Sequence, residues 1–319
     1  MSHRIWRVLT FVCVAVPLLP GQQGNVGGPT SGFVFDSAAH ALRPILGIPG
    51  ASSLGDPVGF TFDVASVAVA PNQDSAFVTA AEGGMHLFRL SSGTWSERSV
   101  DGLGGSPDRV WFSPSGSAAA LYAAGKAQIV TGLPDSPVLA RTQDLGGTPA
   151  ALAISDDGAY LLLNVNASIR LLGSGGDTRN LADASVGALV AFAAKGHDGA
   201  VSDPLGAGLV LYRDLAGSAQ QSVVAAPDDS TASPAGLAFS GDGRKLFLAS
   251  STARSVSMFD LQTGDRAAIA CNCVPAGLVS MGSLFRLNEL GTAPLWLFDA
   301  GAAEPRIVFV PTLAAPAAN

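Results

Sequence analysis

The sequence predicts an all-β fold, a β-propeller of four-stranded sheets that follow one another around a ring. Hairpin-like segments recur along the chain at steps of about 40 residues, and each is followed by two more strand-like segments before the next begins. The composition agrees, because charged residues make up only 13% while 38 glycines and 20 prolines suit many short strands joined by turns. No segment keeps a helical apolar period without glycine or proline, which argues against helical repeats.

The clearest hairpin runs from Pro234 to Ser251. Two apolar runs, Leu237–Phe239 and Leu246–Leu248, flank the turn Gly241–Gly243, where glycine and aspartate allow the positive backbone angles of a tight turn. Its counterparts are expected around Gln73, Gly116, Gly158, Gly199 and Gly282.

Each hairpin is followed by a predicted third and fourth strand, here Ser255–Leu261 and Arg266–Ala270. Packing such sheets face to face buries both faces of each sheet, and closing the array into a ring leaves no terminal face exposed. This explains why the apolar strands need not alternate with polar residues.

The first unit is expected to be incomplete. Gly32–Asp36 resembles the third strands of later units and Leu42–Ile48 fits a fourth strand, so the leading hairpin is missing. We predict seven blades with one reduced, and six blades plus a docked strand pair is the alternative. The propeller is expected to be a single domain over residues 33–311, between a linker at 22–32 and a flexible tail at 312–319.

Residues 1–21 are predicted to be a signal peptide. Arg4 and Arg7 give a basic start, Val8–Leu19 has the length of a signal apolar region, and Pro20 interrupts it. An uncleaved N-terminal anchor is the alternative, although the apolar run is short for a membrane span. We therefore expect export to the periplasm or the outside of the cell.

The excess of acidic over basic residues limits the kinds of partner that we expect this chain to bind. The formal net charge is −7, and loss of Arg4 and Arg7 would make the chain more acidic. A nucleic acid or an anionic lipid would require a basic surface, so neither is expected as a partner. We expect a monomer that touches a membrane only through an uncleaved N-terminus.

Cys271 and Cys273 would remain after signal cleavage. Two lone cysteines in an oxidising compartment tend to pair, but a single intervening residue closes a very small loop with unusual backbone geometry. The sequence leaves the disulfide open. A metal site is not expected, because no second Cys or His pair stands at matching spacing.

The best-formed blade resembles the repeats of YVTN-type and related WD-repeat-like propellers. The resemblance covers about residues 33–311 and implies the propeller fold, but a fold that hosts binding proteins, scaffolds and enzymes implies no single function. The matching residues are Pro234, Gly236–Ser240, Asp242, Gly243, Leu246–Ala249, Ser255–Ser257, Phe259, Asp260, Thr263 and Gly264.

No catalytic residue can be named from the sequence. It contains no nucleophile elbow, zinc-protease helix or phosphate loop, and no cofactor or metal ion is expected. The segment that departs most from the repeat is the extended turn with Lys195, His197 and Asp198. We interpret its residues as turn-forming, and we keep this non-repeat loop as a candidate for function. Any acid–base cluster would draw on a small set, namely Glu82, Glu97, Glu289, Glu304, His40, His86 and His197.

The sequence therefore predicts an exported, non-catalytic propeller that binds a protein or another envelope component. The alternative is a lactonase-like or other hydrolytic propeller with a site at one mouth of the central channel. Three residues of that acid–base set converging at a channel mouth would favour the enzyme.

Overall fold

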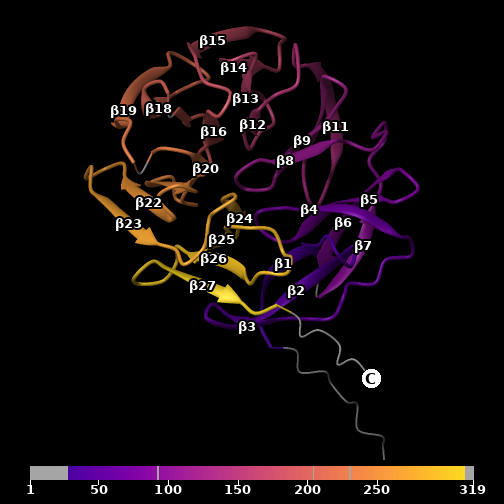
Figure 1. Cartoon of the computed structure of the whole chain (residues 1–319). Coiled ribbons are helices and arrows are strands. Elements are labelled where there is room, and N and C mark those ends of the chain that lie inside the picture. The colour runs from indigo at the N-terminus through magenta and orange to yellow at the C-terminus, as the bar shows by residue number, and fades with distance from the viewer. Residues whose placement is uncertain (1–27, 92, 204, 230, 313–319) are drawn as a thin grey trace, which may run out of the picture.

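The computed structural model describes residues 28–91, 93–203, 205–229 and 231–312. These residues form 27 strands and no helix, so the described chain has no helix that could cross a membrane. The strands make seven antiparallel sheets around a ring, six with four strands and one with three (Figure 1). The predicted propeller of seven blades with one reduced is confirmed. The predicted signal peptide and nearly all of the predicted tail lie outside the described residues.

Each complete blade is a meander whose first strand faces the centre of the ring and whose fourth lies at the rim. The first strands are β4 (Val64–Val69), β8 (Arg109–Phe112), β12 (Ala151–Ile154), β16 (Leu189–Phe192), β20 (Pro234–Phe239) and β24 (Val279–Met281). The second strands are β5 (Ser75–Ala80), β9 (Ala118–Ala123), β13 (Tyr160–Val165), β17 (Gly199–Asp203), β21 (Lys245–Ser250) and β25 (Leu284–Arg286). The third strands are β6 (Met85–Ser91), β10 (Lys126–Thr131), β14 (Ser168–Gly173), β18 (Gly208–Arg213), β22 (Ser255–Asp260) and β26 (Leu295–Asp299). The fourth strands are β7 (Thr94–Arg98), β11 (Val138–Asp144), β15 (Thr178–Asp183), β19 (Gln220–Ala225), β23 (Arg266–Ala270) and β27 (Arg306–Val310).

The core lies between neighbouring blades. Leu162 of β13, for example, packs in one cluster with Phe192 of β16 and Val201 of β17, which belong to the next blade. Strand β5 is buried along its whole length, because blades cover both of its faces. The continuous apolar strands of the sequence therefore have the predicted cause.

The antiparallel meander gives the ring two different ends. The turn end carries the turns between first and second strands, such as Pro71–Asp74 and Asp156–Ala159, together with those between third and fourth strands. The loop end carries the connections between second and third strands and those from one blade to the next, such as Ser185–Ala188.

The reduced blade contains β1 (Thr30–Asp36), β2 (Ala41–Ile48) and β3 (Ala51–Leu54). The prediction that its strands hold the third and fourth positions is wrong. β3 packs against the rim strand β27, and β1 runs from Gln73 at the turn end towards Leu290 at the loop end, which is the direction of a second strand. The sheet therefore fills the second, third and fourth positions, and the described residues supply no inner strand to it. β1 also begins at Thr30, three residues before the expected start of the domain.

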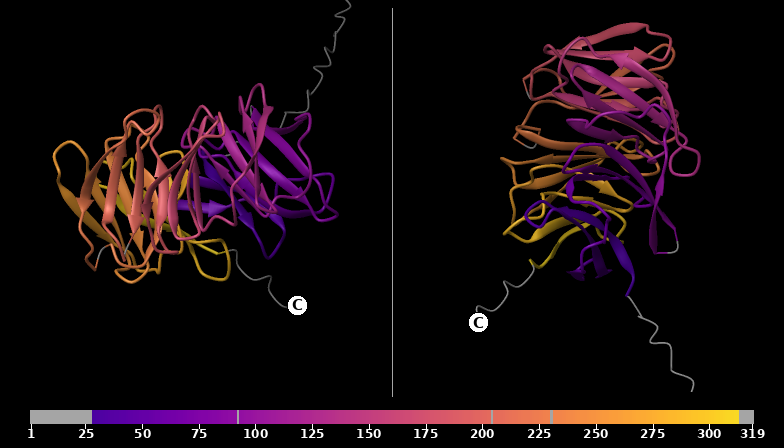
Figure 2. Two further views of the ribbon diagram at one scale, coloured as in Figure 1. Left: turned by 90° about the horizontal axis from the view of Figure 1, so that it is seen from above. Right: turned by 90° about the vertical axis from the view of Figure 1, so that its right-hand side faces the viewer.

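The ring closes where this inner strand is missing. The Gln73 Oε1 atom accepts a hydrogen bond from the Phe33 amide at 2.7 Å, and the Pro71 carbonyl accepts one from the Gly282 amide at 2.6 Å. The first and last blades consequently lie side by side, the indigo strands β1–β3 beside the yellow β26 and β27 (Figures 1 and 2).

Candidate functional site

The inner strands of the six complete blades enclose a central channel with a cavity of about 650 Å³. Its lining is mostly apolar and includes Val110, Leu152, Val190, Leu237 and Val279. These residues line it because the first strand is the inner edge of each sheet, where the neighbouring blades cover its apolar side chains only in part.

The charged residue among the described residues that line this channel is Arg286, at the end of β25. Its guanidinium binds the Glu289 carboxylate through two hydrogen bonds of 2.6 and 2.7 Å. The arginine side chain is 16% exposed, whereas the glutamate side chain is 71% exposed. The pair therefore joins a mostly buried cation at the channel to an anion on the loop-end surface.

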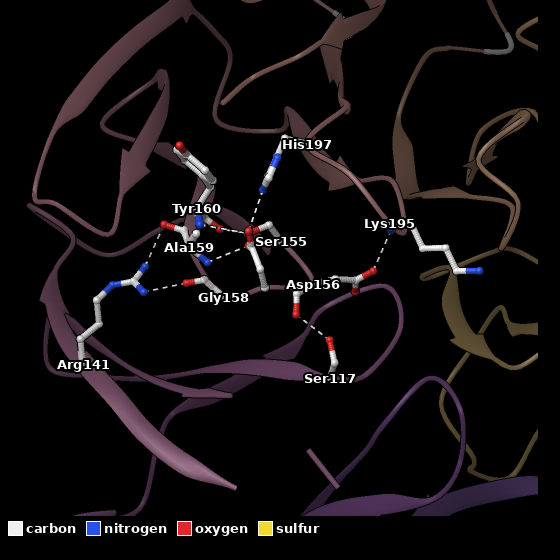
Figure 3. A network of polar contacts seen from close by, with 10 residues as sticks. Ser117, Arg141, Ser155, Asp156, Gly158, Ala159, Tyr160, Lys195 and His197 are labelled. Atoms are coloured by element: carbon white, nitrogen blue, oxygen red, sulfur yellow. Dashed lines mark hydrogen bonds and ion pairs between the residues drawn. The ribbon is translucent and has the colours of Figure 1, made fainter. Parts of the chain in front are cut away.

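A second polar grouping lies at the turn end and connects three blades (Figure 3). Asp156 stands at its centre, in the turn between β12 and β13. Its Oδ1 atom accepts hydrogen bonds from the Ser115 amide at 2.8 Å and the Ser115 hydroxyl at 2.6 Å, both in the preceding blade. Its Oδ2 atom accepts one from the Lys195 amide at 2.9 Å in the following blade. One carboxylate thus bonds to both neighbouring turns.

The adjacent Asp157 binds His197, with 2.9 Å between Oδ2 and Nε2. The imidazole also stands edge-on to the ring of Tyr160, with 4.9 Å between the centroids. Burial raises the pKa of Asp157, but hydrogen bonds from the Ser155 hydroxyl, the Ala159 amide and His197 outweigh it, and the net pKa is lowered. Asp157 is therefore ionised at neutral pH and acts as an acceptor.

The three candidate loop residues have different contacts in the structure. His197 and the amide of Lys195 join the Asp156–Asp157 turn, while Figure 3 shows the Lys195 side chain pointing away from these carboxylates. Asp198 binds the Arg213 guanidinium at 3.0 Å and the Asp214 amide at 3.0 Å instead. The three side chains do not converge on one point where a substrate could be held.

Among the remaining acids and histidines of the predicted set, the described residues contain one acid–histidine pair. His86 contacts Glu97 at 2.7 Å and stacks on Phe62, on the outer strands of one blade. Within the described ranges, no group of three or more His, Cys, Asp or Glu side chains is arranged to hold a metal ion. The set therefore does not assemble at the channel.

Cys271 and Cys273 are joined by a disulfide in the connection between β23 and β24, with their Cα atoms 5.0 Å apart. Both side chains are buried against Phe247 and Phe298. The Arg254 guanidinium donates a hydrogen bond to the Cys273 carbonyl at 3.1 Å. This buried position gives the pair a structural environment away from solvent.

Sequence reasoning did not identify Arg286. A signal was present, because Arg286 stands opposite the start of its inner strand, where the other blades carry neutral residues. Those counterparts are Ala80, Tyr122, Asn164, Ser202 and Ser250. The position can be recognised only once the strand register is known.

No protein-family model and no curated protein matches the chain. Solved structures do match its fold. A protein of unknown function from Desulfotomaculum acetoxidans is 12% identical with a TM-score of 0.57, over 88% of this chain and 99% of that one. A candidate 6-phosphogluconolactonase from Bacteroides uniformis is 11% identical with a TM-score of 0.57, over 88% and 95%. Another from Bacteroides fragilis is 14% identical with a TM-score of 0.56, over 88% and 96%. These similarities establish the propeller fold.

Proposed function

We propose that this chain is an exported, non-catalytic β-propeller, related to YVTN-type propellers, that binds a partner protein of the cell envelope at the loop end of its ring. The observation that carries the proposal is a pair of strongly exposed apolar side chains, Val186 and Leu205, in adjoining connections at the loop end. Exposed apolar groups gathered on one face are typical of a protein interface.

Val186 and Leu205 form this apolar patch. They are 73% and 87% exposed, and they belong to neighbouring connections at the loop end. The Asp203 carboxylate holds both connections, since its Oδ1 atom accepts hydrogen bonds from the Ser185 hydroxyl at 2.6 Å and the Leu205 amide at 3.2 Å. The patch is therefore presented on a fixed base, which lowers the entropy lost on binding.

The polar groups of the molecule support a binding role over catalysis. Asp156 uses both oxygens to hold neighbouring turns, and Arg286 is paired with Glu289. General acid–base catalysis needs a titratable group within hydrogen-bond reach of a reacting atom, and both oxygens of the Asp156 carboxylate already accept hydrogen bonds from neighbouring turns.

The test is capture of envelope proteins with the purified chain. We expect the wild type to retain a stoichiometric partner and the double variant Val186→Ser/Leu205→Ser to lose it. Val138→Ser is the matched control, because Val138 is 55% exposed at the start of the rim strand β11, at the turn end of the ring. Equal retention by all three proteins would reject the proposed interface.

The second candidate is a lactonase-like enzyme, favoured by the two solved propellers described as candidate 6-phosphogluconolactonases. An assay with 6-phosphogluconolactone tests it directly. We expect hydrolysis at the spontaneous rate only, because the channel lining is apolar and its cation is already paired. A rate above background that Arg286→Met lowers would favour the enzyme.

A further inference from the structure

We propose that the central channel binds a small apolar carboxylate, an aliphatic or aromatic body with one carboxylate group, and that this carboxylate replaces Glu289 on Arg286. The proposal concerns a small ligand inside the channel and does not rest on the protein partner proposed above.

The reduced blade, which has three strands in the part of the chain that the structure describes, explains why Arg286 lies at the channel. Asn164, its counterpart in β13, is fully buried and donates hydrogen bonds to the Ser185 and Ala188 carbonyls at 2.8 and 3.1 Å. Those carbonyls lead into β16, the inner strand of the next blade. Within the described residues, the sheet that follows β25 contributes no inner strand and no such carbonyls to Arg286, which lines the channel instead.

The burial of the ion pair is uneven, and this makes the anion exchangeable. Arg286 is mostly buried, and a buried charge without a counter-ion would cost several kcal/mol. Glu289 is mostly exposed and lies in the connection between β25 and β26. Its carboxylate is therefore already largely solvated, and its separation from Arg286 costs Glu289 little free energy. A ligand carboxylate that takes its place keeps the arginine paired through the same two-pronged geometry.

The channel favours an apolar body behind this carboxylate. Val279, opposite Arg286 in the sheet register, is 44% exposed and lines the cavity with Leu278 and Phe285. The cavity of about 650 Å³ lies within the range of about 300–1,000 Å³ found for small-molecule sites. A sugar phosphate would leave its hydroxyl groups without partners on these side chains, whereas an alkyl chain would be matched.

Isothermal titration of the full chain with decanoate, decanol and decyltrimethylammonium tests the proposal without any variant. We expect decanoate to bind at least about tenfold more tightly than the other two, because a charge-assisted bidentate contact contributes about 1.4 kcal/mol or more. Equal affinity for decanol, or absence of decanoate binding, would overturn the proposal.

Two variants locate the binding site. Arg286→Met should weaken decanoate binding at least about tenfold, while Glu289→Gln should strengthen it by removing the competing carboxylate and leaving the arginine in place. Arg213→Met is the matched control, since Arg213 pairs with Asp198 at the turn end and should leave affinity unchanged. Unchanged affinity in both Arg286→Met and Glu289→Gln would overturn the assignment.

A peptide probe separates the two sources of such a carboxylate. An acetylated Ala-Leu-Val-Phe peptide is compared as free acid and as amide. Decanoate binding that depends on Arg286 supports the small ligand. Binding of the peptide acid without binding of decanoate overturns it in favour of a peptide C-terminus. Loss of partner capture in Val186→Ser/Leu205→Ser with decanoate binding intact would separate failure of the interface from failure of the channel site.

Discussion

Aspartates in the turns between first and second strands have one of two roles, either closing their own turn or joining neighbouring blades. The role depends on the position of the aspartate within the turn. Asp157 and Asp242 hold the same place in their turns, and each accepts hydrogen bonds from a serine hydroxyl two residues before it and an amide two residues after it. Asp156, one position earlier, reaches two other blades, and its counterpart Gly241 cannot. Asp242 and Asp157 therefore close turns, and Asp156 joins blades.

Replacement of Asp156 should consequently cost more than replacement of Asp242. Asp156→Ala leaves three donors in two neighbouring turns without their acceptor, which we expect to lower the free energy of unfolding by about 1–3 kcal/mol. Asp242→Ala removes contacts within one exposed turn and is the matched control. Urea denaturation measures both, and an equal loss would contradict the role of Asp156 between blades.

Asp36 should contribute to stability in a pH-dependent way. Burial raises its pKa, but hydrogen bonds from Arg43 and the amides of Ala39 and Ala38, with the arginine charge, outweigh it, so the pKa is lowered. A carboxyl group with a lowered folded pKa stabilises the protein above its unfolded pKa of about 3.9, and this contribution disappears as pH falls through the folded value.

Asp36→Asn should therefore be less stable than the wild type at pH 7, and the gap should narrow between about pH 5 and pH 2. Denaturation midpoints across this range measure the gap. Asp144→Asn is a control, because Asp144 is exposed and accepts a hydrogen bond from the Gly146 amide within its own turn. A gap that stays constant with pH would show that the Asp36 charge is unimportant.

At the scale of elements, the repeat is a hairpin whose turn needs one residue with a positive φ angle. Gly243 supplies it in the turn between β20 and β21, with φ of +71° and its amide bonded to the Ser240 carbonyl at 2.8 Å. This hairpin also reverses the direction of the chain at the turn end. The second strand of each complete blade therefore runs back to the loop end, and the complete blades all point the same way. The reduced blade breaks the pattern by beginning at its second strand.

Substitution of the two glycines in this turn separates backbone strain from crowding. A Cβ atom at Gly243 or Gly241 would meet no atom within 4 Å, but only Gly243 has a positive φ angle. We expect Gly243→Ala to lower the free energy of unfolding by about 1–2 kcal/mol and Gly241→Ala to leave it unchanged or slightly higher. Thermal unfolding measures both, and equal effects would contradict the assignment of strain.

At the scale of the whole molecule, side chains and turns close the ring beside the reduced blade, to which the described residues supply no inner strand. Gln73 is central, because its Oε1 atom accepts from the Phe33 amide and its Nε2 atom donates to the Ala70 carbonyl at 2.9 Å. Gln73 thus bonds β1 of the reduced blade to the next blade, alongside the packing of the Phe33 ring against Trp95.

Gln73→Ala should loosen this closure. We expect the Phe33 amide to exchange with solvent hydrogen faster, and the free energy of unfolding to fall by about 1–3 kcal/mol. Asn72→Ala is the matched control, since the side-chain amide of Asn72 donates a hydrogen bond to the Asp74 carboxylate within its own turn, at 2.7 Å. Unaltered protection of Phe33 in Gln73→Ala would mean that the ring is closed by other contacts.

The sequence alone determines the fold, because apolar runs and glycine-rich turns are local features that repeat along the chain. It also singles out the turn with Lys195 and His197 as a departure from the repeat. Only the tertiary structure decides the strand positions of the reduced blade, the two neighbours of Asp156 and the place of Arg286 at the channel. These depend on which blades become neighbours, as in the bonds from Asp156 to Ser115 and Lys195, which span 41 and 39 residues. Ring closure creates such contacts, and no local pattern encodes them.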